Sequence, residues 1–168
     1  MTETQEKKWY AIRVTYSREL KLQAALQELG YQTFVPMCRR VVERHGKKEE
    51  KLVSAISNLC FVKAHQDELY DYMKSLGESC SAHFIWDKST RKPLVVPTKA
   101  MEDFIKISLS NIDDVIYLHE ISDKLREGQK VRVKKGPFEG VEGTVIRVKR
   151  SRRVMVELPG MLAIATTF

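Results

Sequence analysis

The sequence predicts an α+β domain, in which helices cover an antiparallel sheet, followed by a small all-β barrel. Short strands and amphipathic helices follow one another in the first hundred residues, an order typical of α+β folds. Four of the eight glycines then lie between positions 128 and 143, which favours tight corners and a strongly bent sheet. The 168 residues suffice for one domain of ordinary size and a second, small one.

The elements of the first domain are predicted from apolar periodicity and from residues that begin or end helices. Ser17 is expected to cap the first helix and Gly30 to end it. The apolar stripe expected on this helix consists of Leu20, Ala24, Leu26 and Leu29. The predicted strands are 9–14, 31–35, 59–62 and 82–86, and the predicted helices are 18–29, 66–76 and 99–109.

A long hairpin and a linker complete the predicted layout. Residues 39–43 and 51–55 flank a charged tract, which predicts a hairpin whose tip projects into solvent. The stretch after the third helix is polar and acidic, with one apolar segment at 115–118, and it predicts a linker. The expected boundaries are therefore 1–109 for the first domain, 110–126 for the linker and 127–168 for the barrel.

The predicted barrel begins with a strand that has a basic outer face. Val131 and Val133 point one way, and the lysines and arginine between and beside them point the other. Gly136 and Gly140 can adopt positive φ, and Pro137 favours the corner between them. Further strands are predicted at 143–148 and 154–158, joined by a basic turn.

Composition limits the classes of function. The net charge of +7 and the pI near 9.3 favour phosphate-rich partners, or an anionic membrane, over acidic small molecules. No apolar run approaches the roughly 20 residues that span a bilayer, and the first residues do not form a secretory signal. The three cysteines are widely spaced without a C-x-x-C motif, so we expect no zinc site, no disulfide framework and a cytoplasmic location.

No catalytic constellation is evident. The four histidines are scattered, and no Walker, G-x-S-x-G, H-E-x-x-H or G-x-G-x-x-G pattern occurs. A site that the fold assembles from distant residues is the alternative. We expect a protein that is not an enzyme, with no catalytic residue, no metal and no cofactor.

Two sets of residues resemble the NusG family of transcription factors. Gly128, Val131-Arg132-Val133, Gly136-Pro137-Phe138 and Gly143 resemble the family's KOW domain, a small five-stranded barrel also found in ribosomal proteins. An SH3-like barrel without a nucleic-acid role is the alternative. The N-terminal half resembles the family's NGN domain at Lys8-Trp9-Tyr10-Ala11, Val35-Pro36, Ser57–Val62 and His83-Phe84.

The resemblance covers residues 8–168 and is closer to specialised paralogues, such as RfaH and the UpxY regulators of capsule loci, than to NusG itself. Asn58 in place of glycine and the His83-Phe84 pair support this assignment. Ser57 replaces a proline of the family pattern and Leu59 replaces a tyrosine, so the surface stays apolar while its shape differs.

The resemblance implies an apolar pocket that grips the coiled-coil clamp helices of the largest RNA polymerase subunit. Carried over by position, its residues are Trp9, Tyr10, Ile56, Leu59, Phe61 and Phe84. Core packing is the alternative for these side chains, and for Trp9 and Phe61 it is the stronger one.

Basic residues form two further candidate sites. The hairpin residues Arg39, Arg40, Arg44, Lys47 and Lys48 are expected to contact DNA of the elongation complex, and Arg18 and Lys21 resemble the DNA-reading face of RfaH-type paralogues. The turn residues Lys149, Arg150, Arg152 and Arg153 are expected to face a ribosomal protein or nascent RNA. A solvated surface is the alternative in each case.

The sequence therefore predicts a monomeric transcription elongation or antitermination factor. It would bind RNA polymerase, contact DNA and promote processive elongation, with the paralogue-like residues favouring one operon, for example a polysaccharide locus. The rival hypothesis is a KOW-type RNA-binding or ribosome-associated protein, in which the first domain is only a scaffold.

Overall fold

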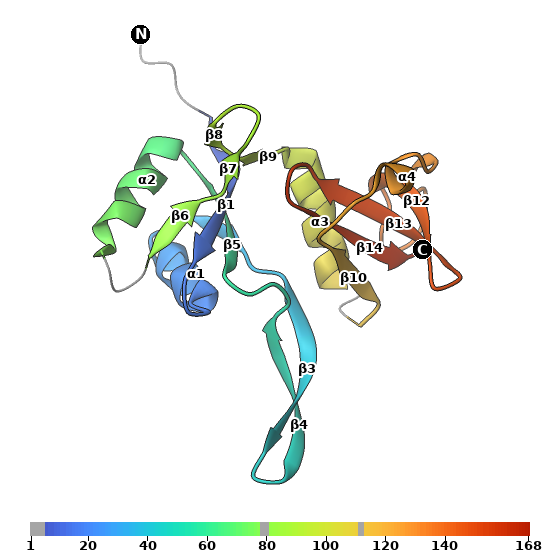
Figure 1. Cartoon of the computed structure of the whole chain (residues 1–168), viewed down its shortest axis with the longest axis horizontal. Helices are drawn as coiled ribbons and strands as arrows, with labels where there is room; N and C mark the ends of the chain where they lie inside the picture. The colour runs from blue at the N-terminus through green and yellow to red at the C-terminus, as the bar shows by residue number, and fades with distance from the viewer. Residues whose placement is uncertain (1–5, 78–80, 111–112) are drawn as a thin grey trace. The chain divides into compact units, whose positions relative to one another are not determined.

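The computed structural model describes residues 6–77, 81–110 and 113–168. These residues form two compact units, one within 1–36 and 54–98 and the other within 37–53 and 99–168 (Figure 1). The first is an α+β unit with an antiparallel sheet, and the C-terminal part of the second is an all-β sheet. This is the fold class that the sequence predicts.

The sheet of the first unit is built around β1. Its described strands lie in the order β2-β5-β1-β6, and β9 also pairs with β1. Most of β1 is buried, because this strand is paired on both sides within the sheet. The strands are β1 (Lys8–Val14), β2 (Gln32–Phe34), β5 (Leu59–Ala64), β6 (Ala82–Phe84) and β9 (Val95–Val96), and β7 (Trp86–Asp87) pairs separately with β8 (Lys92–Pro93).

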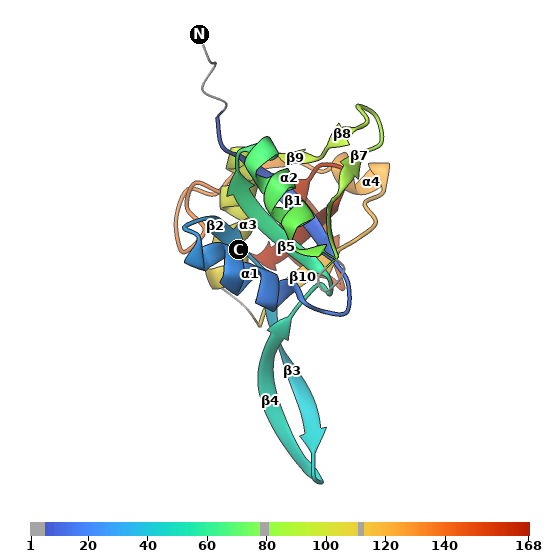
Figure 2. The same ribbon diagram turned by 90° about the vertical axis from the view of Figure 1, so that its left-hand side faces the viewer.

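Helices α1 (Glu19–Glu28) and α2 (Gln66–Ser75) lie on the same side of this sheet (Figure 2). Helix α1 buries Leu22 and Leu26, whereas Leu20 and Leu29 of the predicted stripe are 43% and 59% exposed. The predicted cap is also wrong. Arg18 occupies the N-cap position without a side-chain cap, and the Ser17 amide instead donates to Asn58 Oδ1 at 2.7 Å.

The hairpin is longer and its turn tighter than predicted. Strands β3 (Met37–Arg44) and β4 (Lys47–Ser54) are joined by His45 and Gly46, whose φ angles are 50° and 74°. Positive φ at both central residues is the signature of a two-residue type I′ turn. The charged residues expected in a broad tip therefore lie on the strands, which Figure 2 shows as a long twisted ribbon.

The sheet of the second unit has the order β10-β14-β13-β12-β11. Its first strand, β10, pairs with β14 and comes from the apolar segment 115–118 of the predicted linker. The segment predicted as a linker thus contributes a strand and a short helix. The elements are β10 (Val115–Leu118), α4 (Asp123–Arg126), β11 (Lys130–Arg132), β12 (Glu142–Val148), β13 (Ser151–Leu158) and β14 (Leu162–Thr167).

Helix α3 (Thr98–Ser110) is fastened to the segment that precedes and begins β12. Lys99 Nζ donates to the Gly140 carbonyl at 2.7 Å, and Lys106 Nζ donates to the Glu139 carbonyl at 2.5 Å. The Asp103 carboxylate accepts from the Glu142 amide at 3.1 Å. The structure therefore groups most of this helix with the C-terminal sheet, whereas the sequence assigned it to the first domain.

Candidate functional site

Five of the six residues expected to form the polymerase-binding pocket are spread over both faces of the first unit's sheet, and the sixth, Ile56, lies in the loop before β5. Directly opposed residues of an antiparallel pair point to the same face. Phe84 is opposite Ile12 and therefore shares a face with Tyr10, and the Tyr10 and Phe84 rings lie 5.4 Å apart. Phe61 is opposite Ala11, so the face of Trp9, Leu59 and Phe61 is the other one.

Five of the six side chains are buried. Trp9, Tyr10, Leu59, Phe61 and Phe84 are each exposed by 7% or less. Ile56, in the loop before β5, is half-buried. Burial also raises the pKa of the Tyr10 hydroxyl, with a further contribution from Asp67. The six residues do not form one continuous surface in this structure, and most of them stabilise the core.

An open pocket of about 300 Å³ lies beside Phe84, between α2 and the strands β6 and β7. It is lined by Tyr70, Met73, Lys74, Gly77, Ser81, Ala82, His83, Phe84 and Trp86. Met73, Ala82 and Phe84 are buried, whereas Tyr70 and Trp86 are 53% and 58% exposed. We call these nine residues the Phe84 pocket.

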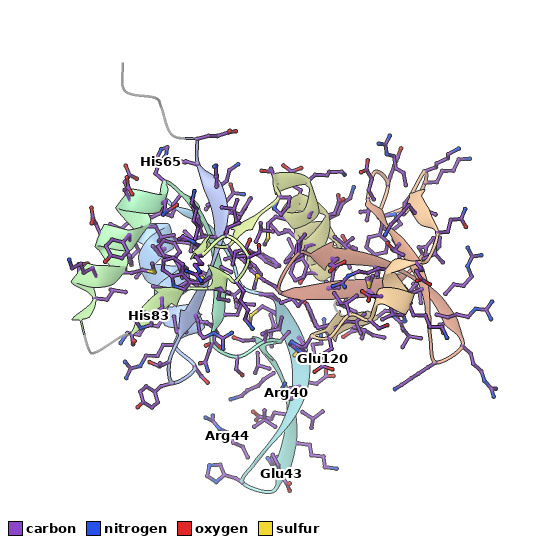
Figure 3. All side chains as sticks on the ribbon, turned by 45° about the horizontal axis from the view of Figure 1, so that its top comes forward. Arg40, Glu43, Arg44, His65, His83 and Glu120 are labelled. Carbon is purple, nitrogen blue, oxygen red and sulfur yellow. The ribbon has the colours of Figure 1, made fainter. Side chains whose placement is uncertain are left out.

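The Phe84 pocket has an apolar interior and a polar rim. Ser81 Oγ and His83 Nε2 lie 2.7 Å apart, and Lys74 adds a positive charge. Figure 3 labels His83. Tyr70 and Trp86 are not among the site residues predicted from the sequence. An aromatic residue directly after the buried Leu69 of α2, and a tryptophan at the end of the predicted strand 82–86, are the signals that could have identified them.

A second ordered feature lies at the start of α1. Asn58 has φ 65°, and its amide donates to Glu19 Oε2 at 3.3 Å while its side chain accepts from Ser17. Tyr16 is 84% exposed, and the Arg18 guanidinium lies 5.6 Å from the centre of its ring. The predicted nucleic-acid residues Arg18 and Lys21 are both solvent-accessible at this end of the unit.

The predicted basic residues of the hairpin are all exposed. Arg39 forms an ion pair with Asp113, with Nε and Oδ1 3.7 Å apart. Within the described part of the chain, Arg40, Arg44, Lys47 and Lys48 form no ion pair. Figure 3 labels Arg40 and Arg44 on β3. Their charges are therefore available to an external anion.

The predicted basic turn of the C-terminal sheet divides into two roles. Lys149 and Arg150 have φ of 48° and 69° and form an exposed two-residue turn. Arg152 lies over the Phe168 ring at 5.7 Å. Arg153 is only 13% exposed and donates to the Asp114 carbonyl at 2.9 Å and to Oδ1 at 3.3 Å. Its contacts are intramolecular, so Arg153 does not lie on the same surface as the turn.

A second cavity, of about 330 Å³, lies between the segment that joins β11 to β12 and the end of β14. It is lined by Val133, Lys135, Pro137, Phe138, Thr167 and Phe168. The described residues contain no cluster of His, Cys, Asp and Glu side chains suited to a metal ion. They also contain no helix with the length and apolar character needed to cross a membrane.

Comparison with protein families identifies both parts of the chain. Residues 7–105, more than half of the sequence, match the family model NusG, described as transcription termination factor nusG. The chain belongs to the NusG family. Residues 127–157 match the KOW motif, which agrees with the all-β character of this segment. The comparison with curated proteins finds no match.

Membership of the NusG family determines the general function. The chain is a non-enzymatic transcription elongation or antitermination factor with NGN and KOW domains, and the family implies binding to RNA polymerase.

Proposed function

We propose that this NusG-family protein docks on the clamp helices of the largest RNA polymerase subunit through the Phe84 pocket and holds the enzyme in its processive state. The open pocket, lined by two exposed aromatic side chains, carries this proposal. It lies within the residues that match the NusG family model.

The chemistry of the pocket suits a helical partner. An amphipathic helix pair binds by inserting apolar side chains into a preformed groove. Tyr70 and Trp86 supply the exposed aromatic surface that dominates binding energy at such interfaces. The buried Tyr10 packs against Phe84 and fixes the inner wall of the pocket. The remaining buried residues of the predicted set support the sheet that carries it.

The basic surfaces are proposed to contact nucleic acid and a further partner. The β3–β4 hairpin, with Arg18 and Lys21 on α1, would hold phosphates of the upstream duplex or the non-template strand, so binding would weaken with salt. Lys149, Arg150 and Arg152 would bind a ribosomal protein or nascent RNA. In functional terms the polymerase module would be residues 1–109 and the recruiting module 127–168, joined by 110–126.

We also propose that the protein acts as a monomer in the cytoplasm on one operon, for example a polysaccharide locus. Asn58 and His83-Phe84, which resemble the RfaH and UpxY paralogues, support operon specificity. The structure gives Asn58 a defined role, because its left-handed conformation organises the loop that carries Arg18.

Substitution of Trp86 tests the docking proposal. Trp86→Ala in the full chain should reduce retention of core RNA polymerase roughly thirtyfold, the effect of losing about 2 kcal/mol at a central aromatic contact. It should weaken pause suppression to a similar extent in run-off transcription on a pause-containing template, measured at a limiting concentration of the protein. Leu59→Glu is unsuitable, because Leu59 is 4% exposed and a buried charge would unfold the domain.

Tyr16→Ala is the matched control, because it removes another exposed aromatic side chain of the same unit outside the pocket. It should leave polymerase retention unchanged. Equal retention by wild type, Trp86→Ala and Tyr70→Ala would contradict docking through this pocket.

The second candidate function is RNA binding or ribosome association through the KOW domain. The cavity lined by Lys135 and the exposed Phe168 favours it, because an exposed aromatic ring beside a basic side chain suits a stacked base and its phosphate. In that case ribosomal RNA binding would survive Trp86→Ala and be lost on replacing Lys149 and Arg150 by Gln.

A further inference from the structure

The β3–β4 hairpin has a register that can be fixed from both ends. The two-residue turn His45-Gly46 places Arg44 directly opposite Lys47. At the open end, the Ala55 amide donates to the Pro36 carbonyl at 2.8 Å, which is the bond expected between the residues opposite each other in the same register. The pairing is therefore continuous along both strands.

This register separates the charges of the hairpin onto two faces. Side chains alternate along each strand, and opposed residues share a face. One face carries the opposed pairs Arg44/Lys47 and Arg40/Lys51, with Val42 and Glu49 between them. Four basic side chains and one acidic side chain thus lie on this face, which we call the basic face.

The opposite face is electrically balanced. It carries Arg39 and Lys48 together with Glu43 and Glu50, and Arg39 is also paired with Asp113. Its centre contains Val41 and Leu52, which are 60% and 56% exposed. Composition alone groups Arg39 and Lys48 with the other basic residues, but the register places them away from those residues.

The spacing along the basic face selects the form of nucleic acid. Arg40 and Arg44 are four residues apart, which at about 3.3 Å per residue separates the two basic pairs by about 13 Å. This is close to the roughly 12 Å width of a B-DNA major groove. Glu49 lies between the two pairs, where a groove would leave no phosphate.

The type of contact is also limited by composition. Residues 37–54 contain no Phe, Tyr or Trp, so the hairpin has no aromatic side chain on which a base could stack. Two-stranded ribbons twist strongly and fit the grooves of duplex DNA.

We infer that the hairpin binds duplex DNA through its basic face alone, with Arg40/Lys51 and Arg44/Lys47 clamping phosphates on the two sides of one groove. This rests on the proposed contact between the hairpin and the DNA of the elongation complex, and it adds Lys51 while removing Arg39 and Lys48. Recognition is of the phosphate backbone and is independent of base sequence.

Paired substitutions in the full chain test the inference. Binding of a labelled 30-base-pair duplex is measured by fluorescence anisotropy between 50 and 200 mM salt. Arg40→Gln with Lys51→Gln, and Arg44→Gln with Lys47→Gln, should each weaken binding roughly tenfold and lower the salt slope by about two. Arg39→Gln with Lys48→Gln removes the same charge from the other face and should change neither value.

A second matched pair of variants removes negative charge and should have the opposite effect on duplex binding. Glu49→Gln removes the acidic group of the basic face and should tighten duplex binding, whereas Glu50→Gln on the other face should not. The wild-type chain should bind a single strand of the same sequence more weakly than the duplex. Polymerase retention is measured in parallel and should be equal for all these variants, so a failure of polymerase docking is seen separately.

Three results would overturn the inference. Equal losses for the two faces would show that only net charge matters. Binding of the single strand as tightly as the duplex would refute the groove-spanning geometry. A Glu49→Gln variant that binds like wild type would show that this face does not approach the phosphates.

Discussion

Asp114 shows how single residues of this chain tie distant segments together. Its carboxylate accepts from the amide and hydroxyl of Thr167 and from Arg153, so it joins the start of β10 to the end of β14. The hydrogen bonds from Thr167, together with the nearby Arg153, lower the pKa of this carboxyl group. The ionised form is therefore the one that stabilises the folded sheet.

The pH dependence of unfolding follows from this shift. Because the folded-state pKa lies below the ordinary value, Asp114 stabilises the fold above pH about 4, and this contribution is lost as the pH falls through the folded-state pKa. Asp114→Asn should therefore lose less stability than wild type between pH 5 and pH 3 in urea titrations. Asp113→Asn, on the more exposed neighbour, is the control, and identical acid profiles for wild type and Asp114→Asn would contradict the assignment.

The role of a residue could be predicted from the sequence where a local pattern determines it, but not where a contact with a distant residue does. Asn58 was noted in the sequence, but its partners Ser17 and Glu19 are 41 and 39 positions away. Arg153 lies in a basic tract and was predicted to bind a partner, because nothing local indicates its bond to Asp114. Tyr70 and Trp86 were missed because their exposure depends on how α2 meets β6.

At the scale of single elements, periodicity located most helices and strands, while packing determined which side of each is buried. Apolar residues lie on more than one side of α1, so periodicity alone does not determine which of them is buried. Tertiary contacts bury Leu22, whereas the sequence predicted that Leu20 would face the core. The polar residues on either side of β10 indicated a linker. The four residues of β10 nevertheless form a strand, because they pair with β14 and extend the C-terminal sheet. The glycines of this domain were expected at corners. Gly128 and Gly143 instead allow close approach of the backbone to Val145 of β12 and to Met155 of β13.

Substitution of Gly143 in β12 tests whether glycine is needed there for close approach of the strands. A Cβ at this position would overlap the Met155 carbonyl oxygen and Val154 Cγ2 of the neighbouring strand. Gly143→Ala should therefore destabilise the sheet by about 3 kcal/mol in denaturant titrations, because the backbone must move. Gly136→Ala is the control. Its Cβ meets nothing within 4 Å, so only the cost of positive φ, about 1 kcal/mol, remains. Equal losses at the two positions would contradict the close-approach explanation.

At the scale of the whole molecule, the order of an α+β domain and an all-β domain could be read from the sequence, because each part has its own periodicity. The grouping of α3 with the C-terminal sheet could not be predicted from the sequence. It depends on polar contacts between Lys99, Asp103 and Lys106 and a segment more than thirty residues later. Charged residues on a helix normally indicate a solvated face, and here they bind backbone groups.

Asp103 is the residue that tests this grouping. It is 4% exposed and accepts from both Lys99 and the Glu142 amide. Asp103→Ala should destabilise the C-terminal sheet by about 2 kcal/mol and speed hydrogen exchange at the Glu142 amide, because a charge-assisted acceptor is lost. Glu102→Ala, on the exposed side of α3, should leave that exchange rate unchanged. Unaltered exchange in Asp103→Ala would show that α3 is not fastened to this segment.

The tight turn of the hairpin has an electrostatic consequence. With no more than His45 and Gly46 between the strands, the polarity of the ribbon depends on its alignment as well as on its amino-acid content. Slippage by a single position would carry Lys47 and Lys51 round to the side of Glu43 and bring Lys48 and Glu50 beside Arg40. The composition would be unchanged, yet the concentrated positive charge would be diluted over both surfaces. The left-handed conformation of Gly46 thus helps to keep the positive charge of the hairpin concentrated on one side.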